Sequence, residues 1–141
     1  MFAVPENTLP LLSAPLVRHP LRVAADLARD EERWRAQVRF DPVERFVLLL
    51  ERTDQYEAWL LTWSPGQGTD PHHHGSATGT FVVVAGVLTE RMIRGAETLL
   101  LRAGQSRVFA PGYSHQVTNT GHEPAVSIHV YRPARRLHSH P

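Results

Sequence analysis

The chain contains no cysteine. This absence excludes disulfide bonds, thiolate metal ligands and cysteine nucleophiles, and it fits an intracellular protein, so we expect a cytoplasmic location. No stretch approaches the roughly 20 apolar residues of a membrane span. Residues 1–17 lack the basic start and apolar run of a signal peptide. The sequence therefore predicts no membrane partner.

The chain also lacks a large excess of positive or negative charge, since its formal net charge is +1 and its sequence pI is about 8.4. Nucleic-acid surfaces need clustered basic side chains, so we expect no nucleic-acid partner, whereas small neutral or anionic ligands stay open. The 141 residues, 42% of them hydrophobic, suit one domain. We expect a monomer or a homodimer, and the sequence does not distinguish the two. We expect an N-terminal extension with helices over 1–39, a β-barrel over 40–134 and a flexible tail over 135–141.

Apolar residues recur at helical spacing between Leu21 and Val38, and they predict one or two short helices with Leu21, Ala24, Leu27 and Trp34 on one face. The many charged residues there fit a solvated helix face.

From Arg45 onward, short runs rich in Val, Leu, Phe and Tyr alternate with turn residues about every ten positions. Short antiparallel strands without intervening helices are typical of an all-β sandwich or small barrel. The expected strands are Phe46 to Leu50, Tyr56 to Trp63, Thr80 to Val84, Val87 to Met92, Glu97 to Leu101, Ser106 to Ala110 and Ala125 to Tyr131.

Histidines are frequent, and three of them are consecutive at positions 72–74. In an extended segment, alternation places His72 and His74 on one face and His73 on the other, so that His72 and His74 can share a metal ion. His115, which follows a turn at Pro111-Gly112, is the candidate third ligand. A hydrogen-bonded core histidine is the alternative for each one taken singly. His138 and His140 also have ligand spacing, but a solvated tail explains them.

Two segments together resemble the paired motifs of the cupin superfamily. The first has Gly66, His72 and His74, and the second has Pro111, Gly112, His115 and Asn119. The resemblance implies a small jelly-roll barrel in which His72, His74 and His115 hold one metal ion.

Many cupins place a glutamate a few residues after the second histidine, whereas this chain has Gly75-Ser76-Ala77-Thr78-Gly79 there. Three neutral imidazoles leave the double positive charge of an ion such as Fe(II) uncompensated, which favours an anionic ligand such as a thiolate or an enolate. We expect Fe(II), while imidazole ligands also accept nickel, copper or zinc.

The segment from Glu123 to Pro133 resembles a strand of cysteine dioxygenase, a cupin that oxidises thiols. In that family alternating Ser, His and Tyr form a hydrogen-bonded relay beside the metal, which implies such roles for Ser127, His129 and Tyr131. Trp63, and Gly79 at a position where some members carry a crosslinked cysteine, extend the resemblance. The alternative to such a relay is that Ser127, His129 and Tyr131 form a row of polar side chains inside the barrel that only hydrogen-bond one another.

One departure concerns the arginine with which this family binds the substrate carboxylate. An ungapped comparison places that arginine at about Leu48 and a neighbouring tyrosine at Phe46, so we expect an apolar substrate pocket formed by Phe46, Leu48, Trp63 and Gly79. Leucine offers no bidentate contact to a carboxylate. Replacement of the arginine from another position is possible at Arg45, Arg52, Arg91 or Arg107.

The sequence thus indicates a non-haem iron(II) enzyme that oxidises the sulfur of cysteine or a related small thiol with O2. One alternative is a diverged cupin of specialised metabolism that decarboxylates cysteine oxidatively, for example toward a sulfonamide. The other is a cupin that binds a metal without catalysis.

Overall fold

The computed structural model describes residues 18–134. The flexible tail expected over 135–141, with His138 and His140, lies outside the described residues, as does most of the expected N-terminal extension. Helices precede strands, as expected: α2 (Pro20–Arg29), η1 (Glu31–Arg33) and η2 (Arg35–Gln37) come before the first strand. Within residues 18–134, no helix is long and apolar enough to cross a membrane.

Helix α2 begins where His19 accepts a hydrogen bond from the backbone N–H of Leu21 and where Pro20 occupies the first turn, a position that needs no donor. Its buried face contains Val23, Ala24 and Leu27. Leu21, which the helical spacing placed on that face, is only partly buried, and Val23 takes its place.

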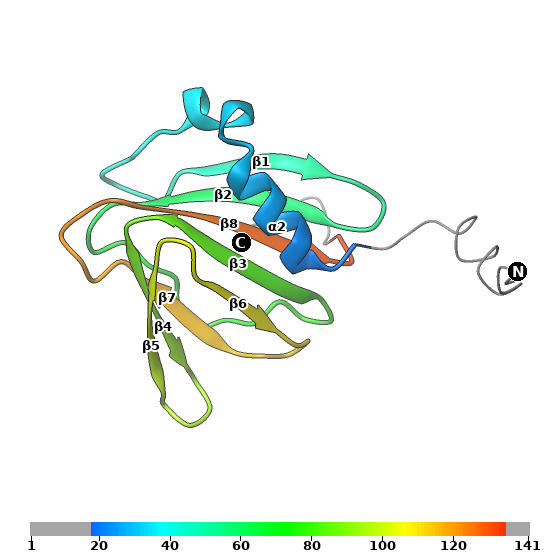
Figure 1. Ribbon diagram of the computed structural model, residues 1–141. Coiled ribbons are helices and arrows are strands. Elements are labelled where there is room, and N and C mark those ends of the chain that lie inside the picture. Colours follow the sequence, from blue (N-terminus) through cyan, green and yellow to red (C-terminus); the bar gives the residue numbers. More distant parts are fainter. Residues whose placement is uncertain (1–17, 135–141) are drawn as a thin grey trace, which may run out of the picture.

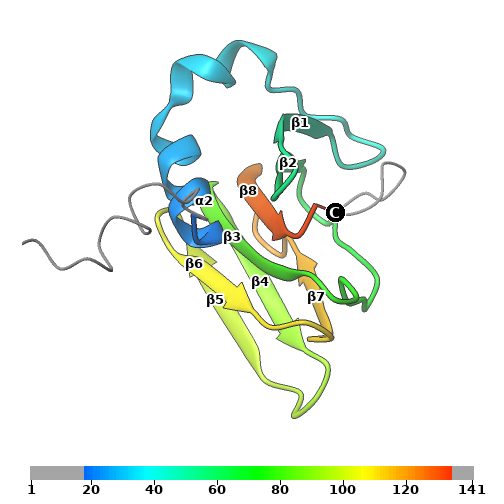
Figure 2. The same cartoon turned by 90° about the vertical axis from the view of Figure 1, so that its right-hand side faces the viewer.

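In the described part of the chain, eight strands follow, and they form two antiparallel sheets (Figures 1 and 2). The five-stranded sheet has the order β1-β2-β8-β3-β6, and the three-stranded sheet has the order β5-β4-β7. This is the expected all-β jelly-roll architecture. The strands are β1 (Val47–Arg52), β2 (Glu57–Trp63), β3 (Thr78–Ala85), β4 (Val87–Met92), β5 (Thr98–Arg102), β6 (Ser106–Phe109), β7 (His115–Thr118) and β8 (Ala125–Arg132).

The five-stranded sheet is covered on both faces, because α2 packs on its outer side against β3 and β8 (Figure 1). Alternation along β2 shows the two faces: Trp59, Leu61 and Trp63 belong to the core between the sheets, whereas Ala58 and Leu60 belong to the core under α2. The inner core surrounds the candidate site, and the outer core fixes the sheet that carries it.

Candidate metal centre

The structure brings His72, His74 and His115 together. One ring nitrogen from each lies within 4.8 Å of the others, a spacing at which the three side chains could hold one metal ion. His72 Nε2 and His74 Nε2 are 3.1 Å apart. His115 is 2% exposed, whereas His72 is half-buried.

Backbone pairing fixes this cluster. His72 and His115 exchange two backbone hydrogen bonds, both of 2.9 Å, so the loop before β3 is bridged to the start of β7 at His72. Alternation in this extended segment turns His73 outward, where it is exposed and its Nδ1 accepts from the N–H of Gly75. His73 is therefore separated from the cluster, as the sequence predicts.

Hydrogen bonds assign the proton on two of the three rings. His72 Nδ1 donates to the Asp70 carbonyl at 2.8 Å, and His115 Nδ1 donates to Glu90 at 2.7 Å. Each Nε2 then presents a lone pair, and His115 Nε2 is buried with no hydrogen-bond partner. A buried acceptor without a donor is costly, so this donor set fits a bound cation.

A chain of polar side chains runs along the inner face beside the histidines. Trp63 Nε1 donates to Ser127 Oγ at 2.8 Å, and Ser127 Oγ lies 2.7 Å from His129 Nε2. Indole can only donate, so the serine proton is best used toward His129 Nε2. His129 Nδ1 then carries the second proton and donates to Tyr131 Oη at 3.4 Å. The Tyr131 ring lies 4.4 Å from that of His74.

Gly79 was expected to line the substrate pocket, but Phe109 occupies the space beside it. A Cβ atom at position 79 would lie 2.2 Å from the Phe109 ring. Because Phe109 also packs on His74 and His115, the lack of a side chain at Gly79 admits a ring that contacts two histidines of the cluster.

Leu48 does not line a pocket either, which corrects the ungapped comparison. Its side chain packs with Leu50 against the outer core under α2, and Val47 instead packs against the inner core. Neighbouring side chains of an extended segment point to opposite faces. Val47, and Arg45 two positions before it, therefore belong to the inward face, whereas Leu48 belongs to the outward face.

Among the four candidate arginines, Arg45 is the one that lies over Trp63, the first donor of this chain of polar side chains. Its Cζ is 5.0 Å from the centre of the Trp63 ring. Burial lowers the pKa of Arg45 from its usual value, and the nearby Tyr131 acts in the opposite direction. The other three arginines bind Glu57 (Arg52), Gln116 (Arg91) and Glu90 (Arg107).

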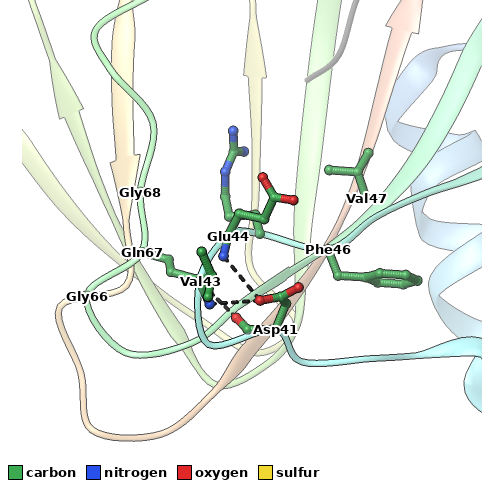
Figure 3. Close-up of a pocket in the computed structure, with 9 residues that line it drawn as sticks. Asp41, Val43, Glu44, Phe46, Val47, Gly66, Gln67 and Gly68 are labelled. Carbon is green, nitrogen blue, oxygen red and sulfur yellow. Dashed lines mark hydrogen bonds between the residues drawn. The ribbon is translucent and has the colours of Figure 1, made fainter.

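Arg45 and Val47 also line an open pocket of about 730 Å³, together with residues of the Gly66–Gly68 loop (Figure 3). Phe46 borders this pocket, but its side chain projects from the opposite side of the chain to that of Val47. The loop is pinned, because the Asp41 carbonyl accepts from Gln67 Nε2 at 2.7 Å. Arg45 is thus held at the boundary between pocket and inner core.

Glu90 on β4 is a buried carboxylate that the sequence analysis missed. Burial alone would raise the pKa of Glu90, but hydrogen bonds from His115 and Arg107 outweigh it and hold the pKa below its usual value. The available signal was a charged residue at an inward position of an apolar strand, two residues after the buried Leu88.

Comparisons with known proteins agree with this geometry. Solved structures with the same fold include a protein from Thermus thermophilus (23% identity, 72% of this chain, 94% of that chain, TM-score 0.65). Another is an RmlC-like cupin from Desulfovibrio desulfuricans (19% identity, 70% and 91%, TM-score 0.62).

A third is an uncharacterised Klebsiella pneumoniae protein with a double-stranded β-helix domain (25% identity, 70% and 85%, TM-score 0.64). The model of the family described as cysteine dioxygenase type I matches residues 20–138. Fold, histidine cluster and sequence lead to the same assignment: the chain is a cupin and belongs to the cysteine dioxygenase type I family.

Proposed function

We propose that this protein is a non-haem iron(II) oxygenase that converts a small thiol bearing a carboxylate into its sulfinate with O2. The observation that carries the proposal is the convergence of three histidine nitrogens next to the chain from Trp63 to Tyr131. A site that only retained a metal would not need that chain, which ends at a hydroxyl whose ring packs on a ligand.

The overall reaction balances without a further reductant, because RSH and O2 combine to RSO2H. Sulfur loses four electrons, O2 gains them, and both oxygen atoms end on sulfur. Iron bound by the three imidazoles would supply the redox chemistry that brings thiolate and O2 together.

Arg45 supports a carboxylate on the substrate. A guanidinium offers two parallel donors, and this geometry matches a carboxylate better than any other small anionic group except phosphate. Its position over Trp63, at the edge of the pocket and near Tyr131, lets it orient a substrate between pocket and metal site. Arg45 would thereby take over the contact that the apolar Leu48 cannot make.

Tyr131 is the proposed proton donor. With its oxygen accepting from His129, Tyr131 can donate its own proton to a substrate atom, and its ring packs on that of His74, one of the three histidines that would hold the metal. Such a hydroxyl can hydrogen-bond a reacting oxygen and hold it next to sulfur.

The test is anaerobic loading with iron(II), followed by O2 uptake and product mass with cysteine, 3-mercaptopropionate and cysteamine. We expect uptake with the two carboxylates and a much weaker response to cysteamine, which lacks a carboxylate. A preference for cysteamine would contradict the role of Arg45. No uptake with any thiol, at full iron content, would contradict thiol oxygenation.

The pocket of about 730 Å³ has room for a thiol larger than cysteine. Oxidative decarboxylation of cysteine or of such a relative is the second candidate function. The same mass analysis distinguishes sulfinate formation from oxidative decarboxylation, because the product of decarboxylation lacks the carboxylate of the substrate.

A further inference from the structure

Glu90 joins the histidine cluster to the three-stranded sheet. Its side chain is fully buried, and it lies on β4 beside β7, which carries His115. Glu90 Oε2 accepts from His115 Nδ1 at 2.7 Å, and Oε1 accepts from Arg107 Nε at 2.6 Å. Tyr113 Oη is 3.4 Å from Oε2. The carboxylate is therefore fixed from three directions.

These contacts have a consequence for the opposite nitrogen of His115. A carboxylate that accepts from Nδ1 keeps the ring proton there and leaves Nε2 as a lone-pair donor. That Nε2 atom is the buried one without a hydrogen-bond partner. His72 is held differently, because its Nδ1 donates to the neutral carbonyl of Asp70.

We infer that Glu90 is a positioning residue for the metal centre, which fixes the tautomer and orientation of His115 and makes His115 a stronger electron-pair donor than His72. The inference rests on the metal site proposed above, although not on the thiol reaction. The five residues after His74 include no glutamate, and Glu90 places a negative charge against His115, on the side of that ring away from the other two histidines.

The chain offers a matched control in Glu57 on β2. Glu57 is equally buried and also binds an arginine, Arg52, at 3.1 Å, while its other oxygen accepts from Trp59 Nε1 at 3.0 Å. None of these partners is a histidine of the cluster. Glu90→Gln and Glu57→Gln therefore remove the same charge from the same barrel at two places.

The experiment measures Zn²⁺ and Co²⁺ affinity by competition with a chelating dye, with the urea midpoint of each variant recorded in parallel. Glu90→Gln is expected to weaken affinity by roughly 10–100-fold and to change the Co²⁺ absorption bands. Glu57→Gln is expected to lower the urea midpoint while affinity stays within about threefold. Equal affinities in both variants and the wild type would overturn the inference.

Arg107→Gln provides a second variant with a different expectation. It removes the cation that offsets Glu90 but leaves the bond to His115, so we expect metal affinity to stay or to increase. If Arg107→Gln weakens binding as much as Glu90→Gln, the network acts only through folding, and the inference is wrong.

Nitrogen-15 spectra of the metal-free wild type test the tautomer without any variant. The inference requires His115 with its proton on Nδ1, and a proton on Nε2 would contradict it. If Glu90→Gln weakens metal binding while no thiol is oxidised, the role of Glu90 stands and the proposed reaction falls.

Discussion

Arg45 and Tyr131 come from distant parts of the sequence, and the fold brings them close enough to interact electrostatically. Arg45 packs over Trp63, and Trp63 is also the first donor of the chain that ends at Tyr131. One aromatic side chain thus orients both the proposed carboxylate partner and the proposed proton donor. Their separate contributions to binding and turnover can be measured one residue at a time.

Arg45→Gln should raise KM for carboxylate thiols about 10–100-fold, because charge-assisted hydrogen bonds contribute roughly 1.5–3 kcal/mol. KM for cysteamine should change little. Steady-state O2 uptake measures both values. Arg91→Gln is the control, since Arg91 binds Gln116. Equal losses for both thiols in Arg45→Gln would show that Arg45 does not recognise the carboxylate.

Tyr131→Phe should lower kcat by about a hundredfold or more while iron content and KM stay near wild type, since general acid–base groups typically contribute that much. Metal analysis measures the iron content, and steady-state O2 uptake measures kcat and KM. Tyr56→Phe is the control, because Tyr56 packs in the outer core. Unchanged turnover in Tyr131→Phe would remove the tyrosine from the mechanism.

Among the elements, strand β1 directs two neighbouring side chains to different cores. Val47 faces the inner core and Leu48 the outer core, and the register shifts between Leu49 and Glu51. A bulge of this kind is invisible in an ungapped comparison, because it changes which residue of a strand points inward without changing composition.

Leu48→Arg should destabilise the protein by roughly 2–4 kcal/mol and should not improve binding of carboxylate thiols, because it places a charge under α2. Urea unfolding measures the loss. Leu49→Arg, at a side chain 42% exposed, is the matched control and should change stability by less than about 1 kcal/mol. Tighter carboxylate binding by Leu48→Arg would restore the ungapped placement.

The sequence pattern predicted the inward side chains of some strands better than those of others. Period-two alternation placed Ser127, His129 and Tyr131 on one face of β8, and the structure has them there, joined by hydrogen bonds. Alternation can place Glu90 on the inward face of β4, two residues after Leu88, but it cannot give the role of Glu90, because that role depends on a partner 25 residues away on another strand. The short strand β7 was anticipated only as the segment after a turn, since four residues carry little periodic signal.

For the whole molecule, the histidine cluster joins separate parts of the barrel. His72 and His74 precede β3 of the larger sheet, and His115 starts β7 of the smaller one. A metal ion held by all three would bind only the folded chain, so it would couple metal binding to global stability.

Zn²⁺ at about 100 times its Kd should therefore add about 2.7 kcal/mol to the free energy of unfolding. For a chain of this length, that corresponds to a rise in Tm of about 8 °C. Differential scanning calorimetry with and without chelator measures the shift. His72→Ala should abolish most of it, whereas His73→Ala should keep it, since His73 is exposed. Equal shifts in both variants would place the ion elsewhere.

In the proposed reaction, this barrel adds both atoms of O2 to the sulfur of a carboxylate-bearing thiol. Mass spectrometry can follow both atoms in the product that the iron-loaded protein forms from cysteine under isotopically heavy dioxygen. We expect a sulfinate that contains two heavy oxygen atoms and retains its carboxylate. A product with one heavy atom or none, or one that has lost carbon dioxide, would contradict it.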